Sequence, residues 1–220
     1  MEFEELKEKI VKFVKEELYS LEPWIYSCEW DEKLPKLNEL REKVKKMGLW
    51  LPQISTDYGG IGLSLQEHGE ISEILGGSPY GFYVFNCQAP DAGNMEILIE
   101  VGTAQQKKDY LTPLLEGKIR SCFAMTEPGY AGSNPTRMGT VAKKENGNYI
   151  INGHKWFTSS FDGADFAIVM VVTDPDEANP YKKASQIIVP TKTKGVEFVR
   201  NVSIMGHPGG GWESHAEIKF

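Results

Sequence analysis

The 220-residue sequence contains no run of apolar residues long enough to span a bilayer as a helix. Its first residues, Met1 to Glu5, include neither a basic region nor an apolar core of the kind that directs secretion. From these two absences we expect neither an integral membrane segment nor a secretory signal. We therefore expect a cytoplasmic protein.

Cysteine is also rare. The three cysteines, Cys28, Cys87 and Cys122, are far apart and form no C-x-x-C pair. No two of the four histidines have the helical spacing of a metal-ligand pair. The sequence thus predicts neither a disulfide framework nor a metal site, and it is typical of a reducing compartment.

Basic residues are outnumbered by acidic ones. Lysine and arginine total 24 against 31 aspartates and glutamates, so the formal net charge is −7 at pH 7. A chain of this charge has no general attraction for phosphate backbones, and we expect no nucleic-acid partner.

The first part of the chain, residues 1–120, has the apolar spacing of helices. Apolar residues recur every three or four positions from Phe3, and Pro23 is expected to end that first helix. Ser64 and Glu67 form a capping box, and Thr103 is placed to cap a later helix. Helices are predicted over residues 3–21, 33–47, 65–75, 80–87, 94–101 and 104–115.

The second part, residues 121–220, changes to the alternation of strands. Asn146-Gly147 separates two such runs and indicates a hairpin. Strands are predicted over residues 139–144, 148–151, 167–173, 184–190, 196–202 and 213–220. The fold class expected is a multi-domain α and β protein: an all-α helical bundle followed by an antiparallel β-sandwich or barrel. Since the last strand pattern stops on Phe220, we expect the chain to have been cut there.

The segment Phe123 to Thr136 reads FAMTEPGYAGSNPT and follows the change of pattern. Its glycines allow backbone N–H groups to approach an anionic ligand, and its hydroxyls add donors. On spacing alone, an ordinary loop leaving a strand is as good an interpretation.

A second segment, Ile151 to Ser159, reads INGHKWFTS. Its adjacent aromatics could form a stacking wall for a flat ring, with hydroxyls at the edge of that ring. The alternative is a core Trp-Phe pair in a strand, which is the commoner fate of adjacent aromatics.

Taken together, the two segments resemble the T-E-P-x-A-G-S-D and I-N-G-x-K-x-W-I-T-N motifs of the acyl-CoA dehydrogenase family. Residues 51–62 and 102–114 are similar to further motifs of its N-terminal domain. Residues 86–95 and 153–157 are most similar to the branch of acyl-CoA dehydrogenase family members 10 and 11. The motifs occur in family order along the whole chain.

The resemblance implies the N-terminal and middle domains of a three-domain enzyme whose C-terminal four-helix domain is absent from these 220 residues. It also implies FAD as cofactor, an acyl-CoA substrate and an electron-transferring flavoprotein as partner. The complete enzyme is expected to form a homodimer or homotetramer. The family's catalytic base is a glutamate, commonly in the C-terminal domain, so we expect no catalytic residue in this chain.

Site residues follow from the resemblance by position. Two groups are expected to bind the flavin ring and its edges, and a third to meet the FAD pyrophosphate, with Ser133 also touching the acyl-CoA. The predicted residues are Phe123, Met125 and Thr126 in the first group, Trp156, Phe157 and Thr158 in the second, and Gly132 and Ser133 in the third.

Two departures from the motifs stand out. Asn134 replaces the signature aspartate, and Tyr130 is an extra residue in the loop. Glu127 lies in the signature but is not the family's base, and we expect it to be a turn or ion-pair residue.

The function expected of the complete enzyme is the α,β-desaturation of an acyl-CoA thioester, with the 220-residue chain inactive alone. Two alternatives remain open at this point. The first is a non-catalytic fragment that binds flavin or acyl-CoA, or serves as a scaffold. The second is an oxidase-type relative of the same superfamily, which reactivity toward oxygen would distinguish.

Overall fold

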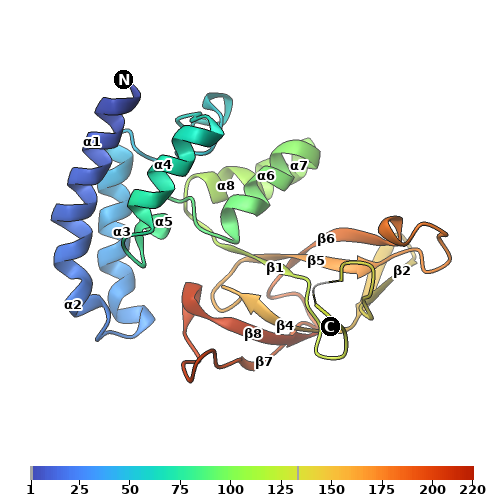
Figure 1. The fold of residues 1–220 in the computed structure, drawn as a ribbon. Helices are drawn as coiled ribbons and strands as arrows, with labels where there is room; N and C mark the ends of the chain where they lie inside the picture. Colours follow the sequence, from blue (N-terminus) through green and yellow to red (C-terminus); the bar gives the residue numbers. More distant parts are fainter. Residues whose placement is uncertain (1, 133) are drawn as a thin grey trace. The chain divides into compact units, whose positions relative to one another are not determined.

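The chain forms two compact units, Met1–Gly117 and Lys118–Phe220 (Figure 1). The computed structural model describes residues 2–132 and 134–220. The first unit is helical and the second is built mainly from strands, which confirms the predicted fold class.

The helical unit contains eight α-helical segments among the described residues, linked in places by π-helical or 3₁₀ turns. They are α1 (Phe3–Phe13), α2 (Glu22–Ile25), α3 (Trp30–Lys46), α4 (Leu65–Leu75), α5 (Gly81–Val84), α6 (Asp91–Val101), α7 (Ala104–Gln106) and α8 (Thr112–Leu115).

The first helix does not end as predicted at Pro23. It continues from α1 through a π-helical turn, Val14–Leu18, and a 3₁₀ turn, Tyr19–Leu21, into α2. Pro23 lies in the first turn of α2, where a proline needs no N–H donor and its fixed φ suits the helix. The proline therefore begins a new segment rather than terminating the old one.

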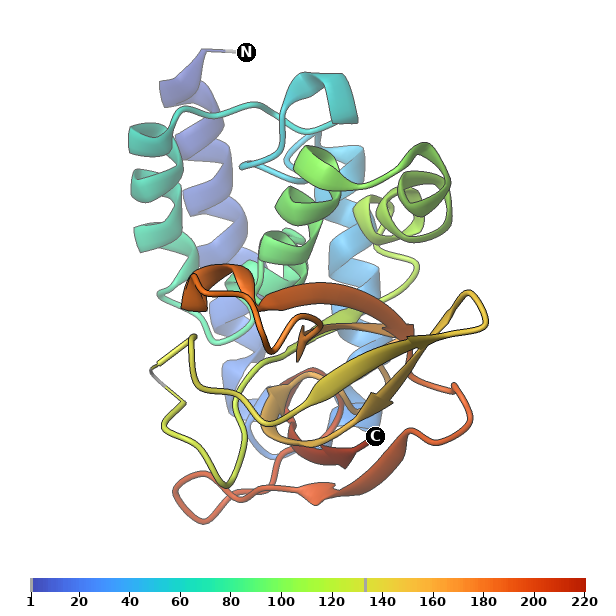
Figure 2. The ribbon, with the colours of Figure 1, turned by 90° about the vertical axis from the view of Figure 1, so that its right-hand side faces the viewer.

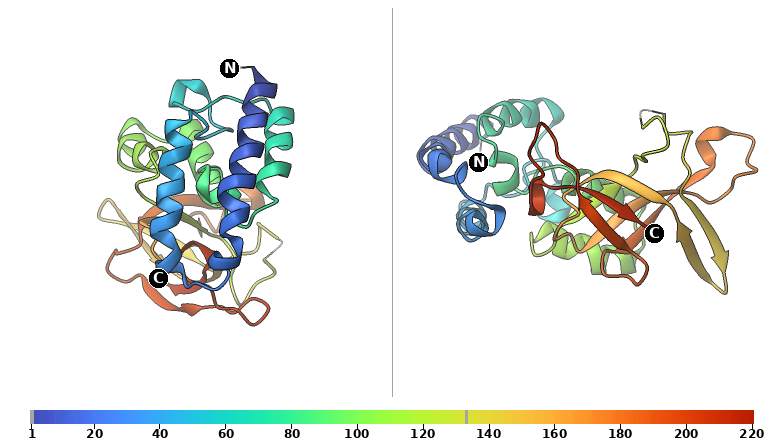
Figure 3. Two further views of the ribbon diagram at one scale, coloured as in Figure 1. Left: turned by 90° about the vertical axis from the view of Figure 1, so that its left-hand side faces the viewer. Right: turned by 90° about the horizontal axis from the view of Figure 1, so that it is seen from below.

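Apolar side chains of α1 and α3 contribute to the core of this unit. Ile10 on α1 and Leu37, Leu40 and Val44 on α3 are completely buried. Figure 3 shows the two helices running alongside each other, and an ion pair between Lys43 and the turn after α1 joins them at 2.9 Å. Burial of each such aliphatic side chain contributes about 1.5–3 kcal/mol, so this stripe outweighs the surface ion pairs.

The predicted helix caps are present. Ser64 Oγ accepts a hydrogen bond from the Glu67 N–H, and Glu67 Oε2 accepts one from the Ser64 N–H at 2.8 Å. Thr103 forms the equivalent box with Gln106 at the start of α7. The helix predicted over residues 104–115 is divided, because a π-helical turn, Lys107–Leu111, lies between α7 and α8.

The second unit contains two sheets. One holds β1 (Ser121–Ala124), β2 (Val141–Glu145), β3 (Asn148–Asn152), β5 (Phe166–Val172) and β6 (Ala184–Pro190), in the order β1-β5-β2-β3 with β6 also on β5. The other holds β4 (His154–Ser159), β8 (His215–Lys219) and β7 (Glu197–Asn201) in that order. The β2–β3 hairpin turns at Asn146-Gly147 as predicted, with positive φ at both residues.

The pairing is mixed rather than purely antiparallel. β5 runs parallel to β1 along four residue pairs and also to the start of β2, whereas its pairing with β6 is antiparallel. β5 reads FAIVMVV and is buried along most of its length, as a strand covered on both faces requires. Side chains of both sheets meet in one apolar core, which includes Cys122, Val169 and Ile218.

No helix among residues 2–132 and 134–220 is long and apolar enough to cross a membrane.

Two glycines of the helical unit should respond oppositely to alanine. Gly69, exposed in the middle of α4, has open space where a Cβ would lie, whereas a Cβ at the buried Gly81 would lie 2.1 Å from the Leu75 carbonyl oxygen. We expect Gly69→Ala to raise the free energy of unfolding by about 0.5–1 kcal/mol. Gly81→Ala should lower it by about 1–3 kcal/mol. Urea unfolding followed by circular dichroism at 222 nm tests this, and equal effects at both positions would contradict the packing described.

Candidate functional site

The two motif segments lie side by side in the second unit. The Thr126 hydroxyl donates to the Trp156 carbonyl at 2.7 Å, and the Trp156 N–H donates to the Thr126 carbonyl at 3.1 Å. The backbone that leaves β1 is thereby tied to the middle of β4. Residues thirty positions apart are held at one place by this reciprocal pair of bonds.

A buried ion pair reinforces the same junction. Lys155 Nζ lies 2.8 Å from Glu127 Oε1 and also donates to the Met125 carbonyl at 2.8 Å. The Lys155 side chain is 0 % exposed and that of Glu127 5 %. Removing two charges from water is costly unless each finds several partners, so this pair must be extensively bonded.

Glu127 meets that requirement with backbone donors. Its Oε2 accepts from the Gly139 N–H at 2.6 Å, and its Oε1 accepts from the Thr140 N–H at 2.9 Å as well as from Lys155. The Glu127 carboxylate, just after β1, thus binds the backbone before β2 and the Lys155 side chain of β4. The expectation that Glu127 is an ion-pair residue is confirmed.

The pKa values reflect this arrangement. Burial acts to raise the pKa of Glu127, but the hydrogen bonds from Lys155, Thr140 and the Gly139 N–H outweigh it and hold the pKa below its usual range. Burial lowers the pKa of the Lys155 ammonium, and the attraction of Glu127 offsets part of that shift. The carboxylate is therefore ionised at neutral pH.

A bulge in β4 sets the orientation of the two aromatic residues. The register between β4 and β8 shifts between Lys155 and Thr158, and Phe157 has a φ of +49°. Such a bulge re-aims side chains while the strand continues. The Trp156 and Phe157 rings lie 4.9 Å apart at an interplanar angle of 59°, and Phe157 is 40 % exposed. The aromatic pair therefore belongs to the surface of the unit rather than to its core.

Thr158 follows the bulge and is completely buried. Its Oγ1 has no hydrogen-bond partner within the part of the chain that the structure describes. An unpaired buried hydroxyl costs about 1–3 kcal/mol, which makes it a candidate for a bond to a group from outside these residues.

Between β1 and β2 the chain forms a long loop, drawn in yellow-green in Figure 2. A Cβ on Gly132 would lie 2.9 Å from the Thr126 methyl group, so only glycine fits there without a shift. Asn134 Oδ1 accepts from both the N–H and the hydroxyl of Thr136, at 3.0 and 2.6 Å. Asparagine thus supplies at this position an acceptor that an aspartate would supply.

The remaining predicted site residues have different positions. Phe123 lies in β1, half-buried and paired in register with Ile168 of β5. Met125 is half-buried and its carbonyl is held by Lys155. Ser133 lies outside the described residues. Six of the predicted residues, Met125, Thr126, Gly132, Trp156, Phe157 and Thr158, therefore gather around the junction of the two segments.

The sequence reasoning missed Lys155 and the backbone donors of Gly139 and Thr140. A signal for Lys155 was present, since it occupies the lysine position of the I-N-G-x-K-x-W-I-T-N motif. No sequence signal identifies a backbone N–H as a ligand of Glu127, because every residue but proline carries one.

A second polar cluster lies along β4, β7 and β8. Ser159 Oγ is 2.7 Å from His215 Nδ1, and burial lowers the pKa of His215, which favours the neutral imidazole. Glu217 on β8 is bonded by His154 and Arg200, each at 2.8 Å. That carboxylate is therefore not available to orient His215 as the third member of a nucleophilic triad.

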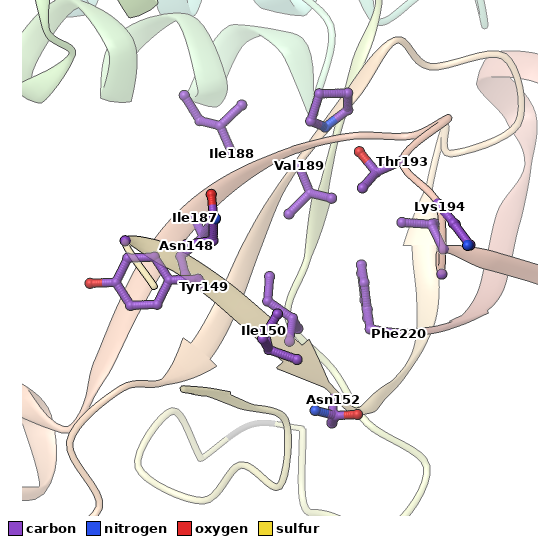
Figure 4. Close-up of a pocket in the computed structure, with 15 residues that line it drawn as sticks. Asn148, Tyr149, Ile150, Asn152, Ile187, Ile188, Val189, Thr193, Lys194 and Phe220 are labelled. Carbon is purple, nitrogen blue, oxygen red and sulfur yellow. The ribbon is translucent and has the colours of Figure 1, made fainter. Parts of the chain in front are cut away.

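A groove of about 590 Å³ lies between β3, β6 and the turn before β7 (Figure 4). Its lining includes Tyr149, Ile150, Ile187, Val189 and Phe220. None of the predicted cofactor residues that the structure describes lines it. The residues that line the groove thus include neither Glu127 nor Lys155.

A helical unit followed by a mixed β unit, with a glycine-rich loop tied to a bulged aromatic strand, defines the class of this chain as a two-unit α-then-β protein. Comparison with known families gives the particular family. Residues 1–118 match the acyl-CoA dehydrogenase N-terminal domain, and residues 122–219 match the acyl-CoA dehydrogenase middle domain. The chain belongs to the acyl-CoA dehydrogenase family.

Individual proteins agree with this assignment. The chain is 41 % identical over 229 residues to acyl-CoA dehydrogenase family member 10 of Mus musculus, covering 98 % of this chain and 21 % of that protein. It is 40 % identical over 226 residues to acyl-CoA dehydrogenase family member 11 of Gallus gallus, covering 96 % and 28 %. These values confirm the similarity to the branch of members 10 and 11.

Solved structures share the fold. An acyl-CoA dehydrogenase homologue from Mycobacterium abscessus superposes with a TM-score of 0.91 at 34 % identity, over 99 % of this chain and 57 % of that one. A structure described as an electron transferring flavoprotein of Acidaminococcus fermentans gives 0.75 at 25 % identity, over 99 % and 54 %. The chain spans about a quarter of the length of the two curated relatives and about half of the solved chains.

The buried ion pair predicts an asymmetric response to mutation. Glu127→Gln leaves the Lys155 ammonium buried without its counter-charge and should cost about 3–5 kcal/mol of unfolding free energy. Adding Lys155→Met should recover most of that loss, because the charge is removed with its partner. Urea unfolding at pH 7 measures both, with Glu5→Gln in the exposed Glu5–Lys9 pair as a control that should leave the unfolding free energy nearly unchanged. Additive losses in the double variant would contradict the pairing.

The same pair predicts an acid-dependent loss of stability. Because the folded-state pKa of Glu127 is lowered, its contribution is fully present above the unfolded pKa of about 4.3 and is lost as the pH falls through the folded pKa. The difference in unfolding free energy between the wild type and Glu127→Gln should therefore be constant near neutral pH and shrink below about pH 4. Glu145→Gln, at an exposed position of β2, serves as the control. A difference that does not vary with pH would show that folding does not lower the pKa of Glu127.

Proposed function

We propose that the chain is part of a FAD-dependent acyl-CoA dehydrogenase, with residues 1–120 and 121–220 as its N-terminal and middle domains. The observation that carries the proposal is the junction at which Thr126, Glu127, Lys155 and Trp156 hold the two family motifs together. Bound FAD would supply the hydride acceptor for α,β-desaturation of an acyl-CoA thioester.

The residues at the junction fit a flavin. Trp156 and Phe157 offer an apolar wall with one exposed ring, and Thr158 offers a hydroxyl that lacks a partner among the described residues. We assign Phe123, Met125 and Thr126 to the flavin ring and its pyrimidine edge, and Trp156, Phe157 and Thr158 to its other side. Hydrogen-bond donors at such edges stabilise negative charge on the reduced ring, and an aromatic wall excludes water.

The β1–β2 loop fits a different part of the cofactor. Gly132 has no side chain to prevent the approach of a pyrophosphate, and it is held against Thr126. We assign Gly132 and Ser133 to the FAD pyrophosphate, and Ser133 also to the acyl-CoA. The fit of Gly132 is supported by its exposure, whereas Ser133 is assigned by its position in the motif alone.

The base that removes the α-proton is proposed to lie outside these 220 residues. Glu127 cannot serve, because Lys155 and the N–H groups of Gly139 and Thr140 occupy both of its oxygens and its side chain is buried. A general base needs an accessible lone pair within reach of the substrate proton. We therefore propose that residues 1–220 alone are catalytically inactive.

Electrons are proposed to leave to an electron-transferring flavoprotein, with the complete enzyme a homodimer or homotetramer. Family membership supports both proposals. We also propose a reducing, cytoplasmic setting, which is supported by the small number and wide spacing of the cysteines, none of which forms a C-x-x-C pair.

The direct test is to titrate the purified full-length protein with FAD and to record its visible spectrum after desalting. A retained flavin band that acyl-CoA bleaches without oxygen is expected. Rapid reoxidation by air after bleaching would point to an oxidase instead. A protein that retains no flavin would contradict the proposed cofactor.

Replacing Thr158 by valine should separate cofactor binding from stability. Valine keeps the shape and removes the unpaired hydroxyl, so the apo protein should be as stable as the wild type or up to about 1 kcal/mol more stable. The dissociation constant for FAD should rise about tenfold, because a donor to the flavin is lost.

The matched control is Thr173→Val, whose hydroxyl bonds Ser185 Oγ at 2.7 Å beyond the end of β5. That variant should lose about 1 kcal/mol of stability and keep its FAD affinity. Equilibrium dialysis with FAD and urea unfolding of the apo protein measure the two effects. Unchanged FAD affinity in Thr158→Val would contradict the role assigned to its hydroxyl.

A further inference from the structure

The loop between β1 and β2 has one residue more than the signature it resembles, and that residue is Tyr130. Tyr130 is 49 % exposed, so about half of this residue is covered by the rest of the chain. The contacts of this ring show whether Tyr130 has a structural role in the loop.

The edge of the Tyr130 ring occupies the space beside Gly139, at the far end of the same loop. A Cβ built on Gly139 would lie 2.5 Å from Cε2, 2.7 Å from the phenol oxygen and 2.8 Å from Cζ. Real Cβ atoms do not approach so closely, so the ring can rest there only because residue 139 is glycine. Gly139 does not have a positive φ, so a Cβ at this position would conflict with the Tyr130 ring rather than strain the backbone.

Gly139 is also the residue whose N–H donates to Glu127 Oε2 at 2.6 Å, and the Tyr130 N–H donates to the Glu127 carbonyl at 3.3 Å. The ring thus closes the loop across its two ends, next to the buried ion pair. Gly132 lies two residues further on and is packed against Thr126. A contact that fixes the ends of the loop also restricts where Gly132 can move.

We propose that Tyr130 is a positioning residue that holds the β1–β2 loop closed through Gly139 and so presents Gly132 to the pyrophosphate of a dinucleotide cofactor. This inference rests on the proposed function, and it adds the residue that arranges the loop before the cofactor arrives. Ordering a loop in its binding conformation beforehand reduces the entropy lost on binding, so the contact acts on affinity.

The test is a double-mutant cycle on the full-length protein with FAD as the probe. Tyr130→Ala removes the ring, and Gly139→Ala displaces it by filling its place. Each should raise the dissociation constant for FAD about three- to tenfold. Because both remove one contact, Gly139→Ala should have no further effect in the Tyr130→Ala background. Tyr130→Phe keeps the ring edge and should bind FAD within about twofold of the wild type.

A second measurement tests the role of Tyr130 without depending on the assignment of FAD as cofactor. Hydrogen exchange of the Gly139 and Thr140 amides in the apo protein should accelerate in Tyr130→Ala and not in Tyr130→Phe. If the wild type does not bind FAD, the proposed function fails, while the exchange rates still test the loop contact. Unchanged exchange in Tyr130→Ala, or additive losses of FAD affinity in the cycle, would overturn the role of Tyr130.

Discussion

The ion pair between Glu127 and Lys155 is the interaction on which the second unit depends. Both side chains are almost completely withdrawn from water. Their hydrogen bonds end on each other, on the Met125 carbonyl, and on the N–H groups of Gly139 and Thr140 before β2. An apolar pair of similar volume could fill the same space, but it could not bond the carbonyl of Met125 or the N–H groups of Gly139 and Thr140. The charges therefore determine which segments meet, and their net contribution to stability is secondary.

Several local features make sense as consequences of that junction. The bulge at Trp156 and Phe157 lets β4 direct Lys155 inward and still present an aromatic side chain to solvent. Thr126 closes the junction on the other side by exchanging hydrogen bonds with Trp156. The buried hydroxyl of Thr158, in the same strand as Lys155 and Trp156, has no hydrogen-bond partner among the described residues. A tightly bonded junction and an unsatisfied hydroxyl thus lie close together, as is common where a protein binds a ligand.

Much of the fold could be predicted from sequence because its signals are local. The Ser64–Glu67 capping box, the Asn146-Gly147 turn and the apolar run of β5 each depend on neighbouring residues alone. Pro23 misled because proline both ends helices and begins them, and the choice depends on packing. The parallel pairing of β1 with β5 joins segments more than forty residues apart, and no local pattern records it. The six gathered site residues came from motif resemblance. The role of Lys155 required the structure, since its two partners, Met125 and Glu127, lie 30 and 28 residues away in the chain.

The central claim is that the buried pair arranges the cofactor site rather than merely stabilising the fold. The most direct measurement is the dissociation constant for FAD of the full-length Glu127→Gln/Lys155→Met variant, at a pH and temperature where its unfolding free energy is close to that of the wild type. The account predicts a folded protein that binds FAD at least about tenfold more weakly, because the ammonium no longer holds the Met125 carbonyl and the carboxylate no longer holds the N–H groups of Gly139 and Thr140. A stable double variant that binds FAD as tightly as the wild type would contradict it.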